Sequence, residues 1–520
     1  MSRAVLYCTV NGVCNNTNGL GRQTKTLLSA LQRHRAELIN CLSPFDVHVA
    51  CPQPGPDIWA FDPADLATSR RVVASWGGLV HALPYDTRAA FWSPPTWQAL
   101  SQAGAGCAVE LARRYDELLV IAVDTPFAGL GEEVSTRRKR SRIRCRVDVL
   151  LAFYSTALIV ERPRPDPARV AWERRAIECA NTEADVWIGD VGRFLSLHLQ
   201  VEYGLSPERL VPFTSSLDLL SPDLGPMSVP AAREVAARWR VPLDRPLVVT
   251  IGRTDPTKGI DILIDAVGPL RDEVHVVIIA VPFGRDDPLI GEYTRHIARQ
   301  GLRATLVTEY TRELPRALCG LPGTRVVACA SRGETLSNVP FEVALWAEYA
   351  GPVVVAPRRD GFVEQIDDGV TGVLYDPAAP GGLTAAIRHA LGLTEVRRAG
   401  MRAAAHARVR AERDVVRNLT QMLAFFWPSQ ELEISESAGE EEVFEVRAPD
   451  LALGRAGLQR MGAEHLGQMV EGPVGVETVR AEDHVVVGDA HHGEVGERVV
   501  DGQQAQVGQQ WGQPAARRQG

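Results

Sequence analysis

The sequence predicts an α/β protein made of two doubly wound domains, each with a parallel sheet between layers of helices. Short apolar runs alternate with amphipathic or polar segments from the start of the chain. A proline-rich passage at Ser221–Pro230 interrupts this alternation, which then resumes. The length of 520 residues allows two to four domains, at about 150 residues per domain.

The N-terminal domain is expected over residues 1–220, followed by a linker at 221–232. Each of its expected strands is followed by a polar or amphipathic segment that can return across the sheet. These strands span residues 4–10, 45–51, 118–124, 147–154 and 185–190.

The C-terminal domain is expected over residues 233–395. Its expected strands span residues 247–251, 274–281, 324–330 and 352–356. The stretch Arg359–Pro377 predicts a loop, a short helix and a hairpin. A long closing helix is expected over 396–428, because helical periodicity runs to Trp427 before a proline stops it.

Residues 429–520 differ in composition from the rest of the chain. They begin with an acidic stretch and continue with many Gly, Val, Gln and Glu residues and few aromatic ones. Such a segment has little apolar surface to offset its ordering entropy, so we expect a disordered tail.

Charge and cysteine content exclude several classes of protein. A formal net charge of −8 argues against a dedicated nucleic-acid binder. Charge or proline interrupts each apolar run before it reaches the about 18 residues that a membrane span needs, and no secretory signal is visible. The 9 cysteines form no C-x-x-C pair, which favours reduced thiols and a cytoplasmic location.

The first candidate site is a glycine-rich stretch at Asn11–Gln23, between a strand and a helix. Its backbone amides near Gly19 and Gly21 could face a phosphate group. A nicotinamide fingerprint is disfavoured, because G-x-G-x-x-G needs glycine where Thr24 stands. By itself this stretch fits an anion site and an ordinary loop about equally well.

The second candidate site carries two cations directly after the strand at 247–251. Arg253 and Lys258 would project from the carboxyl end of a parallel strand, where open α/β sheets bind ligands. The only other lysines in the chain are Lys25 and Lys139, so the use of lysine here is itself informative. Such a pair can clamp a diphosphate and neutralise its developing charge, and we favour that role over a solvated loop.

The third candidate site has two carboxylates, Glu334 and Glu342, on either side of a helix start. Amides near Asn338 and Val339 would form an anion site, and a carboxylate can accept hydrogen bonds from a vicinal diol. Two glutamates at this spacing are also common on solvated helix starts, and taken alone the pattern favours that interpretation.

Together these motifs resemble the retaining nucleotide-sugar glycosyltransferases of the GT-B fold, in particular their large fourth family. The resemblance extends over about Val5–Trp427 and is most specific in the C-terminal domain. Glu334 and Glu342 are similar to the family's E-x7-E motif, and Gly361 with Glu364 to the turn that follows it. Arg253 with Lys258 is similar to its arginine and lysine pair.

The resemblance implies a donor bound in a cleft between two Rossmann-like domains. Arg253 and Lys258 would bind the diphosphate, Glu334 the donor sugar and Glu342 the ribose. The remaining implied donor-binding residues are Gly19, Gly21, Asn338, Val339 and Glu364. The nucleoside-diphosphate sugar would be a co-substrate, with no further cofactor, no metal and no enzymatic nucleophile. A helix near the end of the second domain would return to the first.

One departure from the family pattern and one further likeness concern the acceptor side. Many family members carry a histidine where this chain has Tyr154, so either Tyr154 takes over its contact or catalysis is altered. Asp124 ends a strand where trehalose-phosphate synthases and their pseudo-glycosyltransferase relatives place an acceptor-side aspartate. This weaker likeness keeps a cyclitol or a sugar phosphate among the possible acceptors.

We therefore expect a retaining glycosyltransferase that uses a hydroxyl-bearing acceptor. A nucleotide-sugar epimerase or hydrolase, a pseudo-glycosyltransferase, and an inactive sugar-nucleotide binder stay open as alternatives. The donor base, the sugar and the acceptor are not determined by the sequence. The basic run Arg137–Arg146 could contact anionic lipid, but a solvated surface is favoured, because no apolar face adjoins it.

Overall fold

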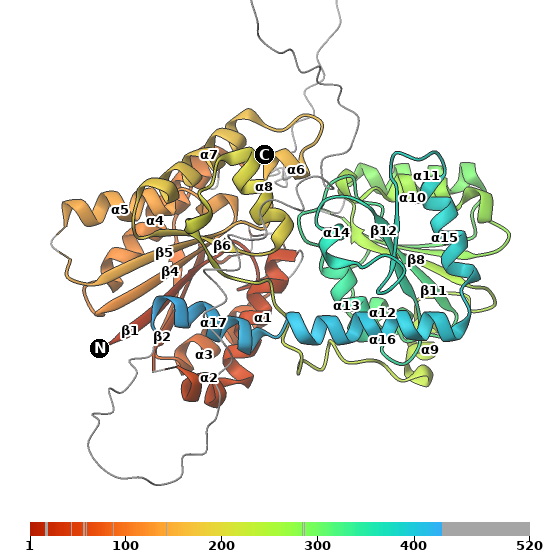
Figure 1. Cartoon of the computed structure of the whole chain (residues 1–520), viewed down its shortest axis with the longest axis horizontal. Helices are drawn as coiled ribbons and strands as arrows, with labels where there is room; N and C mark the ends of the chain where they lie inside the picture. The colour runs from red at the N-terminus through yellow and green to blue at the C-terminus, as the bar shows by residue number, and fades with distance from the viewer. Residues whose placement is uncertain are drawn as a thin grey trace, which may run out of the picture. The chain divides into compact units, whose positions relative to one another are not determined.

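The structure is a computed structural model that describes residues 1–428 except 16–18, 43, 56, 57, 59, 87, 142, 283, 285 and 286. The expected disordered tail at 429–520 lies outside the described residues. Within the described part, two α/β lobes each contain one sheet (Figure 1).

The N-terminal lobe contains a seven-stranded sheet in the order β3-β2-β1-β4-β5-β6-β7. All neighbouring strands pair in parallel. The strands are β1 (Arg3–Cys8), β2 (Asp46–Pro52), β3 (Val80–Leu83), β4 (Glu117–Val123), β5 (Arg146–Ala152), β6 (Val186–Asp190) and β7 (Leu210–Pro212).

Helices cover both faces of this sheet (Figure 1). Alternation along the strands explains the two layers: Leu6 of β1 packs in one apolar cluster, whereas Val5 and Tyr7 pack in the other. The helices of this lobe are α1 (Gly19–Arg33), α2 (Arg35–Cys41), α3 (Pro63–Ser75), α4 (Pro94–Leu111), α5 (Leu130–Arg140), α6 (Ala157–Val160), α7 (Pro167–Thr182) and α8 (Arg193–Tyr203).

The C-terminal lobe contains a six-stranded parallel sheet in the order β10-β9-β8-β11-β12-β13. Its strands are β8 (Leu247–Arg253), β9 (His275–Val281), β10 (Ala304–Val307), β11 (Thr324–Ala328), β12 (Val353–Pro357) and β13 (Val373–Tyr375). Its helices are α9 (Val229–Arg238), α10 (Ile260–Val267), α11 (Pro288–Gln300), α12 (Glu313–Cys319), α13 (Asn338–Trp346), α14 (Phe362–Gln365) and α15 (Gly382–Gly392).

The predicted fold class is confirmed, with differences at the sheet edges. Four short strands, β3, β7, β10 and β13, were not predicted as strands of the sheets, because three or four residues give too little periodicity. The expected hairpin after α14 is wrong: Val373 of β13 pairs in parallel with Val355 of β12.

The expected closing helix is two helices, α16 (Glu395–Glu412) and α17 (Val415–Phe426). The helix breaks because Leu217 pairs with this segment: its amide donates to the Arg413 carbonyl at 2.8 Å, and its carbonyl accepts from the Val415 amide at 3.1 Å. Asp414 then caps α17 by accepting from the Arg417 amide at 2.9 Å. Phe426 and Trp427 join an apolar cluster of the N-terminal lobe.

Candidate active site

The loop after β8 presents two cations at the carboxyl edge of the sheet. Arg253 ends the strand, and Lys258 ends the short 3-10 helix Pro256–Lys258. Gly259 follows with φ of 62°, and a Cβ on it would lie 2.0 Å from the Ala330 carbonyl oxygen. Only glycine therefore lets this loop approach the loop after β11 so closely.

Arg332 ties these two loops together. Its amide donates to the Thr257 carbonyl at 2.7 Å, and its guanidinium donates to the Pro256 carbonyl at 2.6 Å. The same guanidinium pairs with Asp261 on α10 at 2.5 Å. Lys258 and Glu334 are thereby held opposite each other.

Lys258 and Glu334 form an ion pair, with Nζ 2.5 Å from Oε2. Arg253 lies beside them and contacts Asp255 at 3.3 Å. Burial lowers the pKa of the Arg253 guanidinium, although Asp255 and Glu334 act in the opposite direction. The sequence-predicted cations and the first glutamate therefore form one partly buried cluster of charges.

The start of α13 lies next to this cluster. The Ser337 hydroxyl caps the helix by accepting from the Val339 amide at 3.4 Å. The Gln365 side chain fixes Ser337 by accepting from its amide at 3.0 Å and donating to its carbonyl at 2.6 Å. Glu342, one turn into the helix, is buried with 8% exposure.

Helix α1 brings the N-terminal lobe onto α13. The Arg22 guanidinium pairs with the Glu342 carboxylate. Gln23 donates from Nε2 to the Asn338 Oδ1 at 3.3 Å. A Cβ on Gly19 would lie 3.5 Å from the Asn338 Nδ2. The structure thus brings the glycine-rich stretch to the predicted donor side, and it adds Arg22 and Gln23, which the motifs did not indicate.

Glu364 lies on α14 and contacts the N-terminal lobe. Its Oε2 accepts from the Phe194 amide at the start of α8, at 2.5 Å. Burial raises the pKa of this carboxyl, although the Phe194 amide and Arg413 act against the shift. In this structure Glu364 joins the lobes, and its implied role toward a donor stays a prediction.

Asp124 supports the chain at the end of β5. Its carboxylate accepts from the amides of Tyr154 at 3.2 Å and Ser155 at 3.1 Å. Asp124 has φ of 63°, a conformation that is costly outside glycine and is often kept at functional sites. Burial raises its pKa, with Arg169 acting in the opposite direction.

Tyr154 itself is partly buried, and its backbone meets the C-terminal lobe. The Thr335 hydroxyl, next to Glu334, donates to the Tyr154 carbonyl. A second contact between the lobes joins Arg162 to Asp360 at 3.0 Å. These contacts link the loop of Asp124 and Tyr154 to the cluster of Lys258 and Glu334.

A histidine lies close behind this loop, although it comes from another element. His198 on α8 shares a hydrogen bond of 2.9 Å with the Thr156 hydroxyl. Burial, with Arg162 contributing, lowers the pKa of His198 to about 4. Its ring is therefore neutral at pH 7, and it supports the loop from within the core.

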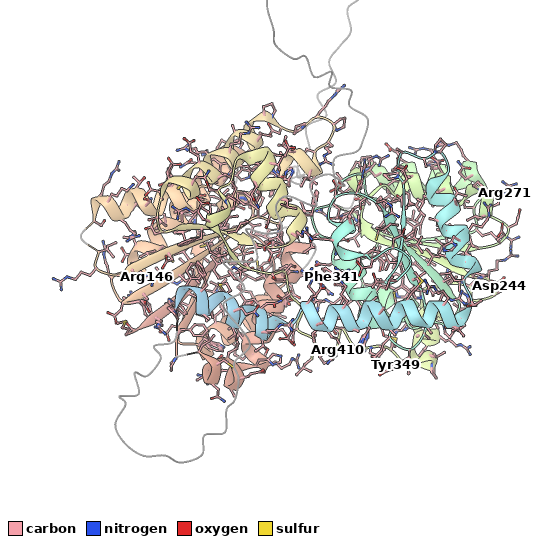
Figure 2. The ribbon with its side chains drawn as sticks, in the orientation of Figure 1. Arg146, Asp244, Arg271, Phe341, Tyr349 and Arg410 are labelled. Carbon is pink, nitrogen blue, oxygen red and sulfur yellow. The ribbon has the colours of Figure 1, made fainter. Side chains whose placement is uncertain are left out.

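The basic run Arg137–Arg146 is largely paired with carboxylates. Lys139 pairs with Glu183 at 2.6 Å, and Arg146 pairs with Asp148 at 2.9 Å. Arg137 and Arg138 pair with Glu133 and Asp185. Arg146 lies on the side of the N-terminal lobe that is far from the C-terminal lobe, whereas Phe341 on α13 lies where the lobes approach each other (Figure 2). The pairing favours the solvated surface that we expected.

Two absences apply to the described residues. Within them, no helix is long and apolar enough to span a membrane. The same residues contain no group of three or more His, Cys, Asp or Glu side chains placed to hold a metal ion. Asp287 caps α11 by accepting from the Leu289 amide at 3.0 Å.

Comparison with known proteins matches the lobe that carries the charge cluster. Residues 245–392 match the family described as "Glycosyl transferases group 1". Over 181 residues the chain is 31% identical to a D-inositol 3-phosphate glycosyltransferase from Xylanimonas cellulosilytica, which covers 34% of this chain and 42% of that protein. The chain spans about half the length of the curated relatives it matches, from 41% to 59%.

Solved structures extend the likeness to both lobes. Sucrose-phosphate synthase from Thermosynechococcus elongatus superposes with a TM-score of 0.60 at 16% identity, covering 82% of this chain and 98% of that one. An α,α-trehalose-phosphate synthase (UDP-forming) from Burkholderia vietnamiensis has a TM-score of 0.54 at 14% identity, covering 82% and 99%. At these identities the likeness shows the fold alone. By the match over residues 245–392, the C-terminal lobe is similar to the group 1 glycosyltransferases, and the two lobes together have the GT-B fold.

Proposed function

We propose that this chain is a retaining glycosyltransferase that moves a sugar from a nucleoside-diphosphate sugar to a hydroxyl group of a cyclitol or sugar phosphate. The observation that carries the proposal is the ion pair between Lys258 and Glu334, 2.5 Å apart and beside Arg253. Two cations and one carboxylate at the carboxyl edge of a parallel sheet suit a ligand that carries both a diphosphate and sugar hydroxyls.

Binding of the donor would rearrange this cluster. Lys258 would exchange its contact with Glu334 for the diphosphate, and Arg253 would take the same group with its planar fork. Glu334, released from Lys258, would accept from hydroxyls of the donor sugar. Arg253 and Lys258 would then already be in place to stabilise the negative charge that develops on the leaving diphosphate. This stabilisation lowers the barrier to its departure.

The reaction that we propose needs no group on the protein to form a covalent bond. The bond between the anomeric carbon and the diphosphate oxygen breaks, and the acceptor oxygen bonds to the same carbon on the same face. The acceptor proton passes to the departing diphosphate oxygen, so charge and atoms balance. Arg253 and Lys258 hold that oxygen close to the acceptor, which makes the transfer effectively unimolecular.

The acceptor would lie on the N-terminal lobe, near the loop that Asp124 supports. The name of the relative from Xylanimonas cellulosilytica, a D-inositol 3-phosphate glycosyltransferase, favours a phosphorylated cyclitol. Tyr154 occupies the position where many family members have histidine, and we assign it a contact near the reacting sugar.

Binding is tested by calorimetric titration of UDP, GDP, TDP and ADP into the wild-type chain, Lys258→Ala and Lys139→Ala. Lys139 is a matched control, because it pairs with Glu183 on the surface of the other lobe. We expect one nucleotide to bind wild type and Lys139→Ala equally and Lys258→Ala about tenfold or more weakly. Equal binding by all three proteins would remove Lys258 from the diphosphate site.

Transfer is tested with the sugar nucleotides of the base that binds, each incubated with inositol phosphate, free inositol and a hexose phosphate. Formation of a glycoside that keeps the donor's anomeric configuration would support the proposal. Isomerised or released sugar without an acceptor would indicate the epimerase or hydrolase. A coupled product that forms only when a nucleotide-activated cyclitol replaces the sugar nucleotide would indicate a pseudo-glycosyltransferase. Binding without turnover would indicate an inactive binder.

A further inference from the structure

A single side chain of the N-terminal lobe reaches the predicted ribose-binding carboxylate of the other lobe. Arg22 lies in the first turn of α1, and its guanidinium pairs with Glu342 on α13. The two residues are 320 positions apart in the chain. No motif of the sequence indicated this contact.

Burial strengthens the ion pair between Arg22 and Glu342. The side chains of Arg22 and Glu342 are only 25% and 11% exposed, so solvent screens their attraction poorly. Burial would lower the pKa of Arg22, but Glu342 and further acidic groups outweigh it and raise that pKa. Arg22 therefore stays charged against a carboxylate that is itself buried, and an unpaired charge there would be costly.

A second contact, made by Gln23, fixes how α1 lies against α13. Gln23, the next residue, donates to Asn338 at 3.3 Å at the first residue of α13. Two consecutive residues of α1 thus contact two residues of α13 that lie one helical turn apart. The start of α1 therefore seats against the start of α13, and the Glu342 carboxylate has its orientation set from the opposite lobe.

Arg22 could either compete with ribose for Glu342 or position this carboxylate for ribose. The number of carboxylate oxygens that Arg22 contacts distinguishes the two roles. If Arg22 used both oxygens of Glu342, a ribose diol would have to displace it. The contact instead joins a single guanidinium nitrogen, Nη2, to one oxygen, Oε1. A carboxylate offers about four acceptor positions on two oxygens, so the pair leaves capacity for a diol.

We propose that Arg22 is a positioning residue for Glu342, so that recognition of the nucleotide ribose depends on contact between the two lobes. The inference rests on the proposed function, because it concerns the same donor site. Its consequence is that ribose hydroxyls bind well only when α1 is seated on α13. Binding of the nucleotide ribose therefore depends on whether the two lobes are in contact.

The test compares whichever nucleoside diphosphate binds wild type, in its ribose form, with its 2′,3′-dideoxy form. Both are titrated into four full-length proteins: wild type, Arg22→Met, Arg22→Lys and Lys25→Met. Lys25 is the matched control, because it lies on the same helix with similar exposure but pairs with Asp65 within the N-terminal lobe. The quantity measured is the ratio of affinities for the ribonucleotide and its dideoxy form. A variant that merely loosened the fold would weaken both nucleotides and leave this ratio unchanged.

We expect wild type and Lys25→Met to favour the ribonucleotide about tenfold or more. Arg22→Met should lose most of this preference while binding the dideoxy form as wild type does, and Arg22→Lys should restore part of it. In a Glu342→Gln background, Arg22→Met should change the ratio no further, because the carboxylate it positions is gone.

Several results would overturn the inference. Tighter ribonucleotide binding by Arg22→Met would show that Arg22 competes with ribose, and an unchanged ratio would show that it plays no part. In both cases the proposed function would stand, since the nucleotide still binds. If wild type bound none of UDP, GDP, TDP and ADP, the donor site itself would be wrong, and this inference would fall with it.

Discussion

The Glu364 carboxylate caps a helix of the opposite lobe, because its Oε2 accepts from the Phe194 amide at 2.5 Å. Helix α8 begins after Gly192, which has no side chain to cap the helix. A Cβ on Gly192 would lie 2.4 Å from the Glu364 Oε1. The missing side chain at Gly192 thus makes room for a cap supplied by α14.

We predict that burial of the Glu364 carboxyl makes stability depend on pH. The folded-state pKa of Glu364 is raised, chiefly by burial, so its protonated form stabilises the fold at low pH. That contribution is fully present below the unfolded pKa of about 4.3 and is lost as pH rises through the folded pKa. Melting curves from about pH 4 to pH 7 should show wild type losing stability relative to Glu364→Gln. A constant difference between the two would contradict the raised pKa.

His198 should have the opposite pH dependence. Its folded pKa of about 4 lies below the usual 6.5, so its contribution is present above the unfolded pKa and is lost as pH falls toward the folded one. At about pH 5 wild type should lose about 2 kcal/mol more than His198→Gln, relative to pH 7.5. Urea unfolding at the two pH values measures this, and equal losses would show that His198 titrates normally.

Removal of the Asp124 carboxylate should destabilise the N-terminal lobe. Asp124→Ala leaves the partly buried amides of Tyr154 and Ser155 without their acceptor, at a cost of about 2 to 4 kcal/mol. Asp124→Asn keeps an acceptor oxygen and should cost less than half of this. Chemical denaturation measures the free energy of unfolding of both variants. A larger loss of stability for Asp124→Asn would show that the charge of Asp124 matters more than its acceptor oxygen.

Truncation after Pro428 should leave the melting temperature nearly unchanged, because Phe426 and Trp427 complete an apolar cluster within the described residues. Truncation after Ala424 is the matched control. It removes Phe426 and Trp427, which are 1% and 5% exposed, and each loss should cost about 3 to 5 kcal/mol. A large effect of the first truncation would show that residues beyond 428 belong to the folded core.

Donor binding should not depend on a divalent cation. Arg253 and Lys258 supply two positive charges beside the predicted diphosphate position, which is the charge a metal ion would otherwise provide. Nucleotide titration with excess EDTA, and then with added Mg²⁺, should give the same affinity. Binding that appears only with Mg²⁺ would contradict this assignment.

Short stretches of sequence are enough to predict the central part of both sheets and the place of Arg253 and Lys258 at or just after the end of a strand. Long strands such as β4 and β8 consist mostly of apolar residues, which indicates that they are buried. The position of Arg253 and Lys258 also follows from nearby chain, because both come at or just after the end of an apolar strand. These features depend on short stretches of sequence, and local periodicity or residue type is enough to predict them. The close approach of Gly259 to Ala330, in contrast, joins two loops that are far apart in the sequence.

The contacts between side chains of the two lobes follow from the tertiary structure alone. Arg22 reaches Glu342 over 320 residues, and Glu364 reaches Phe194 over 170. The break between α16 and α17 likewise depends on Leu217, whose backbone pairs with Arg413 and Val415. The residue pattern of one segment does not identify its partner in another segment. Such contacts form when separate elements pack together, because buried charges and amides then need partners.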